Sequence, residues 1–157
     1  MKKILILIVL ISIFVLSGCG RDTSSPEKAL IGHWDDDNFD YYYSADRVYS
    51  TVKKDAAPEA KESYKEIKNG LEYKVLSLDK DKRTLMIKSV SQNKDIVNYA
   101  LKIQFNSDYT EVKTTVNKKH SDFPKEWEDG ISSMTQKDFD ELANSLKYVD
   151  DKTKPNK

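Results

Sequence analysis

The fold is decided by the stretch Val97-Asn98-Tyr99-Ala100-Leu101-Lys102-Ile103-Gln104-Phe105, in which large apolar side chains occupy every second position. Side chains of a β-strand alternate between its two faces, so this pattern predicts a strand with one face in a core. The polar residues Asn106-Ser107-Asp108 are typical of a turn, and Thr110–Val116 repeats the alternation. We therefore expect a β-hairpin over residues 95–116.

Two further hairpins are expected upstream, over residues 38–52 and 71–91, because both stretches alternate around a short polar turn. In the second hairpin the apolar phase slips by one residue between Val75 and Leu76. Such a slip predicts a β-bulge, since one extra residue moves the following side chains to the other face.

The stretch between these two hairpins has two interpretations. Pro58 is suited to the first position of a helix, with Gly70 beyond its end. Alternatively, Asn69-Gly70 is the residue pair that a two-residue hairpin turn prefers. The sequence favours a short helix or a loop here, and the alternative stays open.

The C-terminal part changes character. Thr135 and Asp138 have the spacing of a capping box, with Asp in place of Glu, and apolar residues then follow at helical spacing. This predicts a helix over Gln136–Leu146. The polar residues 150–157 are expected to form a frayed tail.

Hairpins that follow one another along a chain favour an antiparallel meander, and closure into a barrel removes its edge strands. The fold class predicted is therefore mainly β, with a meander that closes into a small barrel and a C-terminal helix. We place this single domain at residues 30–149.

The first expected strand begins with Gly32-x-Trp34. This motif and the order of the elements resemble the lipocalin-like group of small barrels, including small lipocalin-like lipoproteins of bacteria. The resemblance implies that Gly32 and Trp34 have structural roles and that Trp34 packs under the barrel as a plug.

The N-terminus has the layout of a secretory signal. Two lysines precede the apolar run Ile4–Leu16, and small residues lie in front of Cys19, which is the only cysteine. A cysteine directly after the cleavage site resembles the lipobox of bacterial lipoproteins. We therefore expect a signal peptide over residues 1–18 and cleavage between Gly18 and Cys19.

Cys19 is then expected to carry the lipid, with a diacylglyceryl group on its sulfur and fatty acid such as palmitate as the anchor. Two acyl chains on one residue give stable anchoring. Residues 19–29 are polar and predict a flexible tether. The expected location is the extracytoplasmic face of the cell membrane, in a host with a single membrane.

Charge and composition narrow the classes of partner. The chain carries 26 basic and 26 acidic residues. It therefore has no net basic field to attract nucleic acid. We expect contact with the membrane through the lipid on Cys19, but no nucleic-acid partner.

No catalytic or metal-binding pattern stands out. His33 and His120 are the only histidines, and His33 is expected to be a solvated surface residue. Asp35-Asp36-Asp37 does not continue into a calcium-loop pattern and predicts a solvated acidic loop. We expect no enzyme activity, no metal and no cofactor.

Tyr42 and Tyr49 are the candidate binding residues, because exposed tyrosines are large, rigid and amphipathic. Cross-strand aromatic pairs that only stabilise a sheet are the competing interpretation. The expected function is a membrane-anchored module that binds a protein partner, in preference to a small hydrophobic ligand. The alternatives are an enzyme or accessory subunit that acts on cell-envelope polymers, and a signal fragment over 4–18 that itself acts as a peptide signal.

Overall fold

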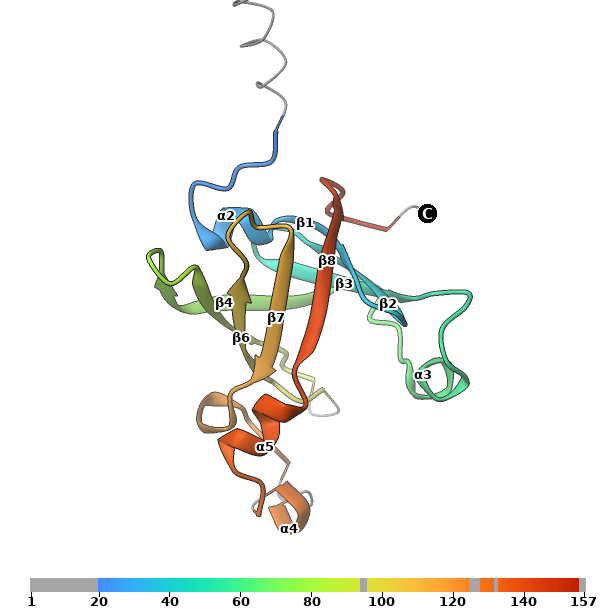
Figure 1. Cartoon of the computed structure of the whole chain (residues 1–157). Coiled ribbons are helices and arrows are strands. Elements are labelled where there is room, and N and C mark those ends of the chain that lie inside the picture. The colour runs from blue at the N-terminus through green and yellow to red at the C-terminus, as the bar shows by residue number, and fades with distance from the viewer. Residues whose placement is uncertain (1–19, 94–95, 125–127, 132, 156–157) are drawn as a thin grey trace, which may run out of the picture.

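The computed structural model describes residues 20–93, 96–124, 128–131 and 133–155. Within these residues eight antiparallel strands follow one another in a meander, each paired with the next, and β8 pairs with β1 to close a barrel (Figure 1). The strands are β1 (Gly32–Asp35), β2 (Phe39–Tyr43), β3 (Arg47–Val52), β4 (Leu71–Asp79), β5 (Thr84–Ser89), β6 (Ala100–Phe105), β7 (Glu111–Val116) and β8 (Asn144–Asp150). The mainly β fold and the closed meander are confirmed.

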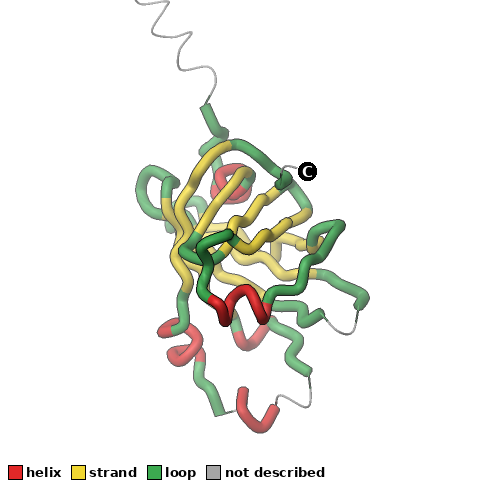
Figure 2. Tube along the Cα trace, turned by 90° about the vertical axis from the view of Figure 1, so that its right-hand side faces the viewer, coloured by secondary structure: helices red, strands yellow, loops and turns green. Residues whose placement is uncertain are grey.

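The helical elements in the described residues are short. They are α2 (Pro26–Leu30), α3 (Pro58–Ser63), the 3-10 turn η1 (Lys118–His120), α4 (Glu128–Ile131) and α5 (Gln136–Glu141). Figure 2 shows α2 enclosed by the strands at one end of the barrel, while the other helices lie towards the opposite end. We call these the α2 end and the far end.

The hairpin predicted over residues 95–116 is present as β6 and β7, which pair from Leu101 with Val116 to Phe105 with Val112. Its first strand begins later than predicted, at Ala100, and Asn98 forms an isolated bridge with Asp122 instead. The bulge predicted in the preceding hairpin is also present. The register of β4 against β5 shifts between Val75 and Ser77, where the apolar phase of the sequence slips. Period-two patterns therefore locate these strands well.

The predicted helix over Gln136–Leu146 is wrong in its second half. The capping box of Thr135 and Asp138 opens α5, but the helix ends at Glu141. The chain then extends into β8, which pairs with both β7 and β1. Leu146 is 3% exposed and packs in the barrel core, so pairing with distant strands overrides the local helical spacing.

Both predicted boundaries of the barrel domain also shift. β8 continues to Asp150, one residue into the predicted tail. At the other end, Pro26–Leu30 forms α2 instead of part of the flexible tether expected over residues 19–29. Ser25, Ala29 and Leu30 are buried, because α2 inserts its apolar side into the end of the barrel.

Of the two interpretations of residues 58–70, the helix is the one observed. Pro58 is the first residue of α3. Gly70 closes a separate turn, in which its N–H donates to the carbonyl of Ile67 at 2.8 Å, and its φ of +67° favours glycine. This turn leads directly into β4.

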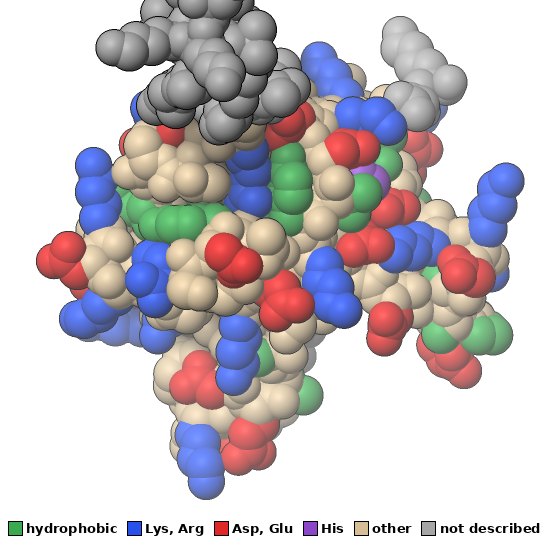
Figure 3. Space-filling view, turned by 45° about the horizontal axis from the view of Figure 1, so that its top comes forward, with side chains coloured by type: hydrophobic (Ala, Val, Ile, Leu, Met, Phe, Trp, Pro, Cys, Tyr) green, Lys and Arg blue, Asp and Glu red, His purple; other side chains and the backbone are tan. Residues whose placement is uncertain are grey.

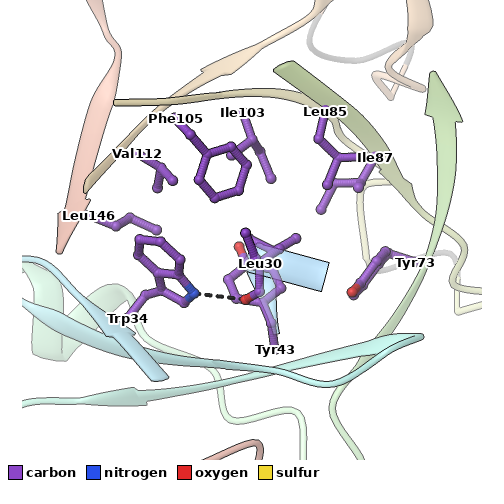
Figure 4. Packing of buried hydrophobic residues seen from close by; sticks show 11 residues of the cluster. Leu30, Trp34, Tyr43, Tyr73, Leu85, Ile87, Ile103, Phe105, Val112 and Leu146 are labelled. Atoms are coloured by element: carbon purple, nitrogen blue, oxygen red, sulfur yellow. Dashed lines mark hydrogen bonds between the residues drawn. The ribbon is translucent and has the colours of Figure 1, made fainter. Parts of the chain in front are cut away.

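The interior of the barrel is filled by side chains (Figure 4). Strand residues and α2 contribute to one cluster of buried residues: Ala29, Leu30, Trp34, Tyr43, Tyr73, Leu85, Ile87, Ile103, Phe105, Val112 and Leu146. Leu85 and Ile87 face inward, as the alternation predicts. The space that a larger barrel would offer to a ligand is here the hydrophobic core.

Candidate functional site

The α2 end is closed by Trp34. Its indole is fully buried, and its Nε1–H donates to the carbonyl of Leu30 at 2.8 Å. The guanidinium of Arg21 lies over the rings of Trp34 and Tyr148, at 4.6 and 3.9 Å from their centroids. Arg21 also donates to the carbonyls of Ala29 and Tyr109, so it ties the chain before α2 to the barrel end.

The backbone conformation at position 32 and the closeness of the surrounding atoms both require glycine. Its φ is +136°, a conformation that L residues with a side chain rarely adopt. An added Cβ would lie 2.9 Å from the carbonyl oxygen of Asp150 and 2.9 Å from the Tyr148 ring. Gly32 and Trp34 therefore build the α2 end and are not on the exposed surface.

The outer surface of β1 and β2 carries a cluster around His33. The His33 ring stacks on Tyr42, with centroids 4.3 Å apart and planes 15° apart. Its Nε2 lies 2.9 Å from Asp40, and its Nδ1 lies 3.5 Å from Asp150 on β8. The His33 side chain is only 12% exposed. The expectation of a solvated His33 is wrong, because side chains from β2 and β8 cover it.

Tyr42 and Tyr49 are direct partners in the register of β2 and β3, so the structure brings the two predicted residues together. Both are half-buried. Gly70 approaches the Tyr49 ring so closely that a Cβ there would lie 2.8 Å from it. Lys154 reaches the same ring from the C-terminal segment, with Nζ 5.9 Å from the centroid. We call His33, Tyr42 and Tyr49 the aromatic face.

A groove of about 620 Å³ extends from the aromatic face towards the turn before β4. It is lined by Arg47, Tyr49, Glu66, Lys68, Asn69, Lys154 and Pro155. Charges of both signs thus surround one tyrosine ring. Burial, followed by the nearby carboxylate of Asp40, raises the pKa of Tyr42. A tyrosine phenol is neutral at physiological pH even at its usual pKa of about 10, so the Tyr42 hydroxyl can donate a hydrogen bond to a partner.

At the far end, the solvated loop predicted for Asp35-Asp36-Asp37 is wrong for Asp35 and Asp36, whose carboxylates are held by contacts within the protein. Asp36 accepts hydrogen bonds from the backbone N–H groups of Asn38 at 2.8 Å and Phe39 at 2.7 Å. It also accepts from Asn144 of β8 at 2.6 Å. Asp35 pairs with Lys53 at 2.5 Å, while Asp37 is exposed. The structure thus engages two of the three carboxylates in the protein's own contacts.

A groove of about 740 Å³ lies beside these aspartates. Its lining combines aspartates and lysines with a few apolar residues: Asp35, Asp36, Asp37, Asn38, Phe39, Tyr41, Lys53, Leu142, Ala143, Asn144, Ser145 and Lys147. In the described part of the chain, no group of three or more His, Cys, Asp or Glu side chains is arranged to hold a metal ion.

The neighbours His120, Ser121 and Asp122 have separate roles. His120 is exposed at the end of η1. The Ser121 hydroxyl donates to the carbonyl of Asn117 at 2.8 Å, and Asp122 pairs with Lys88 at 2.7 Å. These side chains diverge and do not form a catalytic triad.

Gly18 and Cys19, the predicted cleavage and lipidation residues, lie outside the described residues. Among residues 20–155, with their short gaps, no helix is long and apolar enough to span a membrane.

The sequence pattern does not indicate the roles of Arg21 and of Asp40 and Asp150, the two aspartates that flank His33. Arg21 lies in a polar stretch typical of a linker, and nothing local indicates that it stacks on rings of β1 and β8. Asp40 could have been found from the alternation in the first hairpin, since it shares a face with Tyr42. Asp150 could not, because its position depends on the closure of β8 on β1.

Comparison of the chain with models of protein families, with curated proteins and with solved structures found no significant match.

Proposed function

We propose that this chain is a membrane-anchored lipoprotein whose barrel is an interaction module at the cell surface. A protein partner is favoured over a small hydrophobic ligand, and the contact is made by the aromatic face of β1, β2 and β3. The lipid on Cys19 provides the membrane anchor.

The observation that carries this proposal is the filled barrel. Ile103 and Trp34 are 0% exposed and Leu30 is 1% exposed, and these side chains occupy the place where a barrel of this type would hold a ligand. A small hydrophobic ligand needs a concave apolar site that buries most of its surface. With the interior packed, recognition is left to the outer surface, where proteins bind through broad contacts.

The aromatic face suits this role because it is both rigid and amphipathic. Tyr42 is held between its partner Tyr49 and the stacked His33 ring, so it loses little conformational freedom on binding. Aromatic side chains are enriched in the buried centres of protein interfaces. The cross-strand packing of Tyr42 and Tyr49 also stabilises the sheet, and the two roles are compatible.

The anchor is tested with Cys19→Ser in the full chain. We expect loss of metabolic labelling by a fatty-acid probe and a move from the membrane fraction to the soluble fraction. A Cys19→Ser variant that still incorporated the fatty acid would disprove the anchor.

The partner contact is tested by photo-crosslinking in living cells. A photoreactive phenylalanine analogue replaces Tyr42 or Tyr49 in the full chain, and Met86 in the control. Met86 is half-buried on β5 between the inward-facing Leu85 and Ile87, so it points outward away from the aromatic face.

We expect one discrete adduct from the two tyrosine positions and none from Met86. Tyr42→Ala should then reduce the adduct formed from position 49, while circular dichroism shows an intact fold. The lost cross-strand packing should lower the unfolding midpoint, which must stay above the temperature of the experiment. The same adducts from all three positions, or none from the tyrosines, would contradict the proposed contact.

A further inference from the structure

Strand β4 exposes three large apolar side chains close together. Val75 is 45% exposed, Leu76 is 38% exposed and Leu78 is 36% exposed. We call these residues the β4 patch. The bulge in this strand leaves Leu76 outside the regular pairing with β5, whereas Val75 and Leu78 pair with Ile87 and Leu85. Soluble surfaces expose single apolar residues often, but a contiguous patch indicates a contact with something apolar.

The β4 patch adjoins α2. Val75 lines a groove of about 280 Å³ together with Lys28 and Ile31 from the region of α2. The remaining lining residues are Glu27, Ala45, Tyr73 and Leu85. The exposed apolar surface of the hairpin thus continues to the α2 end of the barrel.

The α2 end is also the end of the barrel from which the chain continues towards Cys19, the proposed anchor. Arg21 is fixed there by its bonds to Ala29 and Tyr109 and by its position over the Trp34 ring. Cys19 precedes Arg21 by two residues, so their Cα atoms are at most about 8 Å apart. A lipid on Cys19 therefore brings the α2 end, and the hairpin beside it, to the membrane surface.

Lysines surround the β4 patch. Lys74 and Lys80 are exposed, the Lys82 side chain is 80% exposed, and Lys28 is 52% exposed. Carboxylates lie among these lysines: Lys28 pairs with Asp22 at 2.9 Å, Asp79 pairs with Lys82, and Asp81 shares the turn. Much of the positive charge is therefore offset, and Lys74 and Lys80 contribute most of what remains. Figure 3 shows hydrophobic side chains on the β4 side of the α2 end with Lys and Arg side chains around them. Apolar side chains framed by lysines suit the boundary between anionic headgroups and acyl chains.

We propose that the β4 patch docks on the bilayer surface, so that the anchored barrel lies on the membrane with its α2 end down and its far end pointing away. This inference rests on the lipid anchor proposed above. It extends that function by giving the barrel a defined orientation, which a flexible tether would not impose.

The test uses the full, lipidated chain in vesicles of equal parts phosphatidylcholine and phosphatidylglycerol. Because Cys19 is the only cysteine and carries the lipid, an introduced cysteine is the only free thiol. A spin label is placed at Leu76→Cys, with Leu142→Cys as the control. Leu142 is 70% exposed at the end of α5, at the far end.

Power saturation then measures collision of each label with oxygen, which partitions into lipid, and with a water-soluble nickel complex. We expect a several-fold lower nickel accessibility and a higher oxygen accessibility at position 76 than at 142. The protection at 76 should weaken in pure phosphatidylcholine and should not change when the protein is diluted in lipid.

Equal accessibility at the two positions would overturn docking. Protection that disappears on dilution in lipid would also overturn it, because a second copy would then cover the patch. Vesicle flotation separates the two proposals. If the protein floats while its label at position 76 stays accessible, the anchor is supported and the docking is overturned. If the chain carries no lipid and does not float, both proposals are overturned.

Discussion

The two ends of the barrel are closed by different means. At the α2 end, Trp34 and Leu30 are almost completely removed from solvent, and Arg21 stacks on the rings of Trp34 and Tyr148. At the far end, the turn between β1 and β2 is held by hydrogen bonds to Asp36, and α5 is held by a capping box. The α2 end is closed by buried apolar side chains, whereas the far end is held by hydrogen bonds.

This difference predicts where the fold is sensitive to substitution. Burial of a large apolar side chain contributes about 1.5–3 kcal/mol and leaves a cavity when it is removed. A single hydrogen bond in a partly solvated turn contributes about 0.5–1.5 kcal/mol. Substitutions at the α2 end should therefore destabilise the whole barrel, whereas those at the far end should have smaller and more local effects.

The largest effect is expected from Trp34→Ala. The substitution empties the centre of the plug and leaves the Leu30 carbonyl without its indole donor. Trp→Ala changes in cores cost about 3–5 kcal/mol. Urea unfolding followed by circular dichroism measures the loss. Trp34→Phe, which keeps a ring, should lose clearly less, and an equal loss for both would argue that ring packing is unimportant here.

Gly32→Ala tests the backbone beneath the same plug. The residue sits at φ +136°, and a strained conformation of this kind costs about 1–3 kcal/mol for other residues. We expect the upper part of that range, because the new Cβ would also overlap Asp150 and Tyr148. Gly20→Ala is the matched control, since a Cβ there meets no atom within 4 Å. Thermal unfolding should separate the pair, and similar midpoints would contradict the assigned role of Gly32.

At the far end, Asp36→Ala should destabilise by about 1–2 kcal/mol, because it removes acceptors for two backbone N–H groups and for Asn144. The neighbouring Asp37 is exposed, and Asp37→Ala should change stability little. Urea unfolding of both variants makes the comparison. Hydrogen exchange should show the loss of protection confined to the β1–β2 turn and the start of β8. Loss of protection at the α2 end instead would mean that the two ends are not independent.

Most of the barrel could be predicted from the sequence because its hairpins are local. Alternation and turn residues fix β6 with β7, and the phase slip in β4 marks the bulge. β8 was missed because Phe139, Leu142 and Leu146 also fit a helical period. Only the long-range pairing of β8 with β7 and β1 selects the strand, and a single chain segment carries no signal for such pairing.

The candidate site was predictable to the same extent. Tyr42 and Tyr49 lie on adjacent strands of one local hairpin, so their pairing follows from its turn. The environment of His33 does not follow, because it needs Asp150 from the closing strand. The β4 patch was hidden as well, since the sequence shows apolar residues at the bulge but not that they stay exposed.

The smallest effect is expected at the α5 cap. The Thr135 backbone N–H and hydroxyl bond to the Asp138 carboxylate and hold the pKa of Asp138 below its usual value. A carboxyl group with a lowered folded-state pKa stabilises the fold above its unfolded pKa of about 3.9, and this stabilisation is lost as the pH falls through the folded pKa. Thr135→Ala removes the hydroxyl but keeps the backbone N–H, so the pKa of Asp138 should rise only part of the way towards its usual value. Separately, loss of the N-cap hydroxyl that accepts from the Asp138 N–H should cost about 1 kcal/mol of helix stability. Titration of the Asp138 carboxyl by NMR in both chains measures the shift. A pKa of Asp138 that did not respond would mean that the Thr135 hydroxyl does not hold the Asp138 carboxylate.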